Sequence, residues 1–251
     1  MLNQMDRSLL QACLNGARPA NEHPRLSATP MTAEAIAAVR AGARSLHVHP
    51  KNSRGDDSLE STDVASWVAA LRASCPGIPI GVTTGEWTAP DAAARLAMIS
   101  AWSVLPDFAS VNWHEDGADD VARLLLDRGV GVEAGIWNID GARRWASSPI
   151  RSSCLRTLIE VADLPGEVGK PVAEELIALV RRVDPTIPIL LHGEERSTWP
   201  ILGMAVSSGL DTRIGLEDTL ELPDGSLAHG NGELVTAAAA IAAERMRPRQ
   251  E

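Results

Sequence analysis

The chain has 251 residues, of which 45% are hydrophobic and 22% are charged, and its formal net charge is -10. This composition is that of a folded protein and excludes a disordered chain, while the acidic balance argues against binding to nucleic acid or to an anionic membrane. No apolar run approaches the roughly 20 residues that cross a membrane, and the first residues lack the basic start of a secretory leader. We therefore expect a cytoplasmic protein with small-molecule partners.

Short apolar runs alternate with longer alanine-rich stretches, which is the pattern of parallel strands joined by crossover helices. The predicted strands are residues 9–15, 45–49, 78–83, 108–113, 129–136, 154–161, 187–192 and 211–216. The predicted helices are residues 31–42, 60–74, 90–103, 117–128, 140–147, 167–183, 198–208 and 231–247. Eight such units in about 250 residues predict an α/β protein with a single (β/α)8 TIM barrel, which we expect to form one domain over residues 1–251.

The second predicted strand contains His47 and His49, two residues apart. Residues at this spacing point to the same face of a strand, so both imidazoles can bind one ion where strands enter their βα loops. Glu217, near the end of the last predicted strand, can supply a carboxylate. Two imidazoles and a carboxylate beside an open position form a catalytic zinc set, although these donors also bind Fe(II). The alternative is two hydrogen-bonded structural histidines and a surface salt bridge of Glu217.

Charged residues crowd the last predicted strand, where Arg213, Glu217 and Asp218 fall within six residues. Burying them there costs free energy unless they pair with one another or with a ligand, which favours a ligand site over a surface salt bridge. His192 and His114 end two other predicted strands. Each is either a pocket residue or a satisfied strand-end histidine, and we predict neither as a primary metal ligand.

Five short motifs lie in order along almost the whole chain. They are LNGA at 14–17, HVH at 47–49, VTTG at 82–85, VNW at 111–113 and RIGLED at 213–218. In these motifs the chain resembles the β-keto acid cleavage enzymes. RIGLED is the most specific of the five, and its combination with HVH carries the resemblance.

The resemblance implies a (β/α)8 barrel with zinc on His47, His49 and Glu217, and an exchange between a β-keto acid and acetyl-CoA that gives acetoacetate and a new CoA ester. It also implies roles for four further residues. They are Asp218 as proton acceptor, Arg213 as the group that orients it, Thr83 in the position of a family serine, and Glu133 as an acid of the substrate pocket. Fe(II) or another divalent metal remains an alternative to zinc. A homo-oligomer is also expected.

Three residues at predicted strand ends are expected to bind substrate: Thr84, Asn112 and Trp113. Threonine and asparagine can hydrogen-bond a carboxylate or an oxyanion, although they are also ordinary capping residues. The tryptophans after predicted strands three, four, five and seven could form an apolar lining for an acyl group or stack on adenine, or else fill the core. These are Trp87, Trp113, Trp137 and Trp199.

The chain departs from the family pattern at two loops. Arg18 follows the first motif where the family has an acid, which reverses a charge in the expected base network. After HVH the family commonly continues with an arginine and an aspartate, whereas this chain reads PKNSR at 50–54. Contacts to the substrate tail or to CoA phosphates can therefore differ. Lys51 and Arg54 could make such contacts, or they could be solvated loop charges.

Two other functions remain open at this stage. The first is a metal-dependent barrel hydrolase, which would keep the histidine pair but needs further histidines from middle strands; predicted strands five and six contain none. The second is a barrel that binds an acyl-CoA without turnover, which the arginine at position 18 suggests. Acetoacetate formation separates the exchange enzyme from both.

Overall fold

The computed structural model describes residues 8–27 and 31–245. Its strands are β1 (Leu10–Cys13), β2 (Ser45–Val48), β3 (Ile80–Thr83), β4 (Phe108–Asn112), β5 (Gly131–Ile136), β6 (Arg156–Val161), β7 (Ile189–Gly193) and β8 (Thr212–Ile214). Its α-helices are α1 (Thr32–Ala41), α2 (Ser61–Ser74), α3 (Ala92–Ser100), α4 (Ala118–Asp127), α5 (Ile139–Ser147), α6 (Gly166–Val183), α7 (Thr198–Ser207) and α8 (Asn231–Arg245). Short 3-10 helices are η2 (Pro24–Ser27), η3 (Glu86–Thr88), η4 (Arg151–Ser153) and η5 (Glu195–Ser197).

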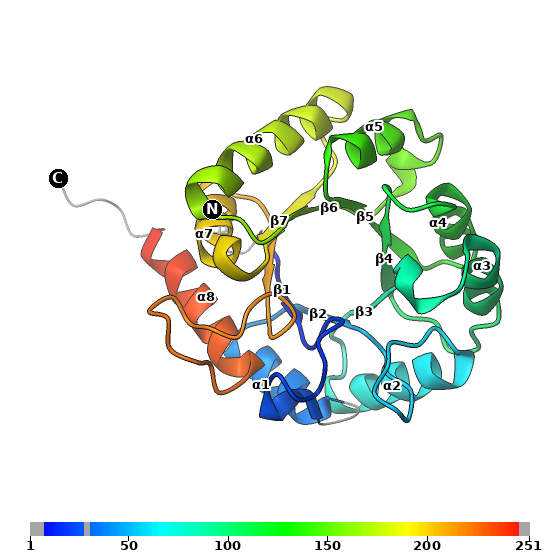
Figure 1. The fold of residues 1–251 in the computed structure, drawn as a ribbon, viewed down its shortest axis with the longest axis horizontal. Helices are drawn as coiled ribbons and strands as arrows, with labels where there is room; N and C mark the ends of the chain where they lie inside the picture. The colour runs from blue at the N-terminus through cyan, green and yellow to red at the C-terminus, as the bar shows by residue number, and fades with distance from the viewer. Residues whose placement is uncertain (1–7, 28–30, 246–251) are drawn as a thin grey trace.

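The strands form one parallel sheet in the order β7-β6-β5-β4-β3-β2-β1-β8. The sheet curls into a barrel inside a ring of helices (Figure 1). It closes between β7 and the start of β8, where Leu190 bridges Asp211 in parallel register and the Leu191 amide donates to the Asp211 carbonyl at 2.9 Å. The prediction of a (β/α)8 TIM barrel is confirmed.

Every predicted strand and helix is present, with ends that differ by a few residues. The first predicted strand, 9–15, shortens to Leu10–Cys13, and the last, 211–216, shortens to Thr212–Ile214 because the chain turns there toward the site described below. Residues 246–247 of the last predicted helix, and the first seven residues of the chain, lie outside the described residues. In the described part, none of the helices is long and apolar enough to span a membrane.

Short-range chemistry fixes several helix ends. Asp91 caps α3 by accepting a hydrogen bond from the Ala94 amide, and Asn138 caps α5 in the same way from Gly141. Gly42 ends α1 in the left-handed region, with φ at 119°, and its amide reaches back to the last carbonyls of the helix. These caps set where each βα unit turns, and hence where the loops at the two ends of the barrel begin.

The core lies between the barrel and its helices, and the strands alternate between that layer and the barrel interior. Along β2, Leu46 and Val48 belong to the hydrophobic core, whereas His47 faces a cavity at the end where strands enter their βα loops. Buried tryptophans such as Trp102 and Trp145 fill the same core layer. The fold therefore separates an apolar shell from a polar interior that opens at one end.

Candidate active site

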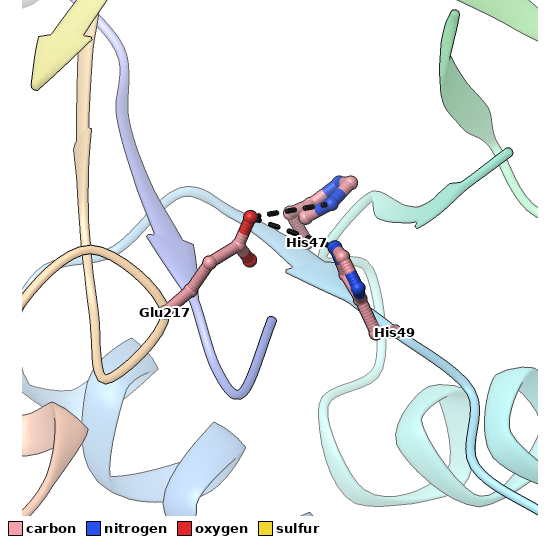
Figure 2. A group of neighbouring side chains, drawn as sticks. All are labelled: His47, His49 and Glu217. Carbon is pink, nitrogen blue, oxygen red and sulfur yellow. Dashed lines mark ion pairs between the residues drawn. The ribbon is translucent and has the colours of Figure 1, made fainter. Parts of the chain in front are cut away.

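His47, His49 and Glu217 come together at one end of the barrel, from β2 and from the loop after β8 (Figure 2). Oε1 of Glu217 lies 4.0 Å from Nε2 of His47 and 3.5 Å from Nε2 of His49. One ligand atom from each residue lies within 4.8 Å of the other two. This spacing suits three donors around one cation of roughly 2 Å bond length, so these residues could hold a divalent metal.

The backbone that presents Glu217 is packed tightly against the end of β1. A Cβ on Gly16 would lie 2.5 Å from Cγ of Glu217, and Gly16 also has φ at 56°, so a side chain there would displace the carboxylate. A Cβ on Gly215 would lie 1.8 Å from the Cys13 carbonyl oxygen, which in turn accepts from the Glu217 amide at 3.3 Å. The glycines of LNGA and RIGLED thus allow β1 and β8 to place the ligand.

His49 is fixed through both its backbone and its ring. Its amide and carbonyl bond the side chain of Asn15 at 3.0 and 2.8 Å. Its Nδ1 contacts Asp57 at 3.1 Å, and the same carboxylate accepts from Trp87 Nε1 at 2.7 Å and from Lys51 Nζ at 2.5 Å. A carboxylate on one ring nitrogen leaves the other, Nε2, directed at Glu217, which is the usual arrangement of a metal-bound histidine.

The electrostatics of the three candidate ligands fit a cation. Burial lowers the pKa of His47 to about 3, so its ring is neutral and keeps a lone pair. Burial opposes a charge on His49, but Glu217 and Asp57 outweigh it and raise its pKa to about 9, so the acids favour positive charge at this ring and a metal would displace its Nε2 proton. Despite burial, Arg213 and the two histidines hold the pKa of Glu217 well below its usual range. Glu217 Oε2 is buried with no hydrogen-bond partner among the described residues, as a metal ligand would be.

A second cluster lies beside the first and is joined to it by Arg213. Nη2 of Arg213 lies 2.9 Å from Glu217, 3.4 Å from Asp218 and 3.6 Å from Glu160. His192 bridges Glu160 and Asp218 with 3.2 Å contacts on its two nitrogens. Burial and Arg213 oppose a charge on His192, yet the two carboxylates raise its pKa to about 9. Asp218 is fully buried, and its Oδ1 lies 3.2 Å from His192 and 3.4 Å from Arg213.

A cavity of about 450 Å³ opens over both clusters. Six of the residues predicted from the sequence line it: His47, His49, Thr83, Asn112, Arg213 and Glu217. Asp218 is not among the lining residues and lies behind Arg213. The structure thus gathers the three predicted metal ligands and half of the other predicted polar residues around one space.

Thr84 and Trp113 lie elsewhere. Thr84 is buried, and its hydroxyl donates to the Ser110 carbonyl at 2.7 Å. Trp113 follows Asn112 and points to the other side of β4, where it packs in the hydrophobic core and donates to Asp119 at 3.2 Å. Neither lines the cavity. Their predicted contact with substrate has no support from this geometry, and alternation along a strand is the physical reason.

Glu133 lies deeper in the barrel interior and is fully buried on β5. Gln11 donates to it at 2.9 Å and Arg156 lies 3.2 Å away, while Arg156 also contacts Asp211 at 3.3 Å. Burial raises the pKa of Glu133, and Arg156 opposes that shift. The structure therefore places this predicted catalytic acid in a polar layer below the cavity, where it is not one of the lining residues.

The four tryptophans after strand ends divide into two pairs. Trp87 and Trp137 line the cavity, whereas Trp113 and Trp199 do not. Trp87 stacks on His49 with ring centroids 5.8 Å apart, and Trp137 lies against the ring of His114 at 4.8 Å. The expected aromatic lining is therefore formed by two indoles.

Arg18 lines the cavity but does not contact the Asp218 carboxylate. Its Nε donates to the backbone carbonyl of Glu217 at 3.2 Å, and its guanidinium pairs with Glu22 at 3.0 Å and with Glu195. The positive charge of Arg18, which stands where the family has an acid, is thus neutralised by Glu22 in the loop after β1 and by Glu195 after β7. Arg54, the other loop cation considered from the sequence, is exposed.

Sequence reasoning did not find several acids of the site, among them Asp57, Glu160 and Glu194. Asp57 lies in the loop after β2, which folds back so that Asp57 forms an antiparallel bridge with Lys51. The sequence does not reveal this bridge, so sequence reasoning had no signal for Asp57. Glu160 and Glu194 lie at the ends of β6 and β7 and line the cavity. The rule that polar residues at barrel strand ends are informative could have found these two.

Comparison with known proteins agrees with the motifs. The profile of the beta-keto acid cleavage enzyme family matches residues 8–250. The chain belongs to this family. Two curated β-keto acid cleavage enzymes, both named 3-keto-5-aminohexanoate cleavage enzyme, are similar to it at 24% identity: one from Fusobacterium nucleatum over 96% of this chain and 93% of its own length, and one from Acetoanaerobium sticklandii over 97% and 94%.

The solved structure of another protein, ObcA, has a fold similar to that of this chain. ObcA, in a ternary complex with a C4-CoA adduct and oxalate, superposes with a TM-score of 0.69 at 16% identity, over 86% of this chain and 62% of ObcA. The chain therefore spans less than two thirds of ObcA. At this identity the likeness concerns the fold.

Proposed function

We propose that this β-keto acid cleavage enzyme exchanges the acyl group of a β-keto acid with acetyl-CoA, giving acetoacetate and a new CoA ester. The observation that carries the proposal is the convergence of His47, His49 and Glu217 on one point, directly beside the Arg213 and Asp218 pair and under one cavity. A site for a cation next to a buried carboxylate is what proton abstraction beside a carbonyl requires.

The same three residues would hold the metal, which we propose to be zinc because two imidazoles and one carboxylate with an open position are a catalytic zinc set. Bound there, the metal would supply positive charge to the oxygen of an enolate. Fe(II) suits the same donors, and elemental analysis of the purified protein distinguishes the two metals.

Asp218 would accept the proton from the carbon between the carboxylate and the keto group of the substrate. Its Oδ2 is buried with no hydrogen-bond partner among the described residues, so no donor of the described chain competes for this oxygen. Its Oδ1 contacts Arg213 at 3.4 Å and His192 at 3.2 Å, and these two contacts orient the carboxylate. Arg213 also lines the cavity, so it can contact the substrate carboxylate on the other side.

Thr83 and Asn112 would position the substrate. The Thr83 hydroxyl oxygen accepts from the Gly85 amide at 3.2 Å, which leaves its proton free to donate into the cavity. The Asn112 amide nitrogen donates to Glu115 at 2.8 Å, and Glu115 is paired with buried Arg95, so the orientation of Asn112 is fixed from behind. Both side chains can therefore order a carboxylate or an oxyanion without first losing much side-chain entropy.

The test is to incubate the purified, zinc-loaded protein with acetyl-CoA and a panel of β-keto acids that differ in tail charge and size, and to follow acetoacetate and the new CoA ester by mass spectrometry. Wild-type protein is expected to form both in equal amounts. The matched variants are His47→Gln, which removes a ligand, and His229→Gln, which changes an exposed histidine in the loop before α8. If neither the wild type nor the His229→Gln control forms acetoacetate with any acid of the panel, that result would falsify the proposal.

A further inference from the structure

Two carboxyl groups meet where the neighbouring strands β6 and β7 end, and neither has a role in the chemistry described so far. Glu160 ends β6 and Glu194 follows β7, and both line the cavity. Their side chains are hydrogen-bonded to each other. We call Glu160 and Glu194 the acid pair.

Hydrogen bonding between two carboxyl groups requires that one of them carries a proton. Glu160 is the ionised member, because His192 lies 3.2 Å and Arg213 3.6 Å from it, and they lower its pKa although burial opposes this. Glu194 is the protonated member. Burial and the neighbouring charge of Glu160 raise the pKa of Glu194 to about 8, with Asp218 acting in the same direction and His192 against it.

From this geometry we propose that Glu194 is a catalytic proton donor and acceptor for the sulfur of CoA. As the substrate carbanion attacks the acetyl carbonyl and the C–S bond breaks, the electron pair goes to sulfur and the Glu194 proton follows it, giving the free thiol. When that sulfur attacks the keto carbon of the intermediate, the C–S bond forms and the thiol proton returns to Glu194. The C–C bond then breaks, its electron pair goes to the carbon beside the carboxylate of the departing acetoacetate, and that carbon takes back the proton that Asp218 accepted. No net proton is consumed. This inference rests on the proposed function.

The other ionisable groups near the cavity are less suited to this step. Arg213 stays charged and cannot release a proton at neutral pH. Asp218 already has the separate task of accepting the proton from carbon. His192 contacts carboxylates on both nitrogens at 3.2 Å, so both of its protons are already directed at Glu160 and Asp218. A thiol titrates near 8.5, so Glu194 is close to the matched acidity at which transfer in both directions is efficient.

The first experiment compares Glu194→Gln with Glu195→Gln. The glutamine at 194 still donates to Glu160 but has no proton to release, so kcat with acetyl-CoA is expected to fall about 10²-fold while KM for the keto acid changes little. Wild-type kcat should be high below pH 8 and decline above it, because Glu194 loses its proton there. That decline should disappear in Glu194→Gln. It should persist in Glu195→Gln, because the native Glu195 carboxylate pairs with Arg18 and is not part of the acid pair.

The second experiment asks whether the proton goes to sulfur. Release of free thiol is measured with two short acetyl thioesters, one of an alkyl thiol and one of a more acidic aromatic thiol, which leaves without a proton. Glu194→Gln is expected to lose activity with the alkyl thioester and to approach wild type with the aromatic one. Equal losses with both would overturn the inference and leave the proposed function intact. Absence of acetoacetate from wild type with acetyl-CoA would overturn both.

Discussion

Arg95 and Arg213 are both buried at the same end of the barrel, yet they belong to different kinds of charge cluster. Arg95 pairs with one carboxylate, Glu115, and donates to backbone carbonyls. Both oxygens of Glu115 are used, since the second accepts from Asn112 at 2.8 Å. Every carboxylate oxygen of this cluster therefore has a donor, and the cluster supports the wall of the cavity without needing a ligand.

Arg213 instead faces three carboxylates, those of Glu160, Glu217 and Asp218. Oxygens of Glu217 and Asp218 remain buried with no hydrogen-bond partner among the described residues. Unpaired buried carboxylate oxygens are costly, so a fold retains them where a ligand or a reaction uses them. The contrast teaches that burial of charge alone does not mark an active site; an excess of acceptors over donors facing a cavity does.

The largest effect is expected from Glu217→Gln. The amide removes the anionic ligand and part of the excess negative charge around Arg213, so bound metal should be lost and activity should fall by more than about 10³-fold. Metal content and acetoacetate formation measure this, with Glu233→Gln in the first turn of α8, where the acid pairs with exposed His229, as control. Full metal content with normal turnover in Glu217→Gln would break the comparison.

Glu115→Gln tests the cluster of Arg95 and Glu115, in which both carboxylate oxygens have donors. It leaves Arg95 buried without its anion, so the free energy of unfolding should fall by about 3 to 5 kcal/mol, measured by urea denaturation. Asp116→Asn changes the exposed acid next along the chain and should alter that free energy by less than about 0.5 kcal/mol. An undiminished stability of Glu115→Gln would show that the pair is not structural.

A smaller effect is expected from Asp57→Asn, which weakens the group that orients His49. Metal affinity should fall roughly 10- to 100-fold, measured by competition with a chelator. Asp56→Asn is the matched control, because Asp56 is exposed and pairs with Arg54. Equal affinities for the two variants would mean that the contact with Asp57 does not position the ring.

The smallest effect should come from Trp87→Phe. This change keeps an aromatic ring against His49 but removes the Nε1 donor to Asp57, a single hydrogen bond to a carboxylate. The expected loss is about 1.5 kcal/mol or less, near tenfold in metal affinity at most. A loss as large as that of Asp57→Asn would show that the indole, and not the carboxylate, fixes the histidine.

Much of the site could be predicted because strand periodicity is a local property. His47 and His49 share a face because they are two residues apart, and the same rule separates Asn112, which lines the cavity, from Trp113, which packs outside β4. Substrate binding by Trp113 therefore stays a prediction, although the alternation of the strand places its side chain in the core.

The sequence by itself determined the alternation of strands and helices, the order of eight βα units and the motifs that place His47 and Glu217 on strand ends, because these depend on neighbours along the chain. Only the tertiary structure decided which acids meet. Asp57 reaches His49 through the fold of a loop, and Glu160 meets Glu194 because β6 and β7 are adjacent in the barrel. Such contacts depend on how a loop folds and on which strands become neighbours, and local sequence does not encode either.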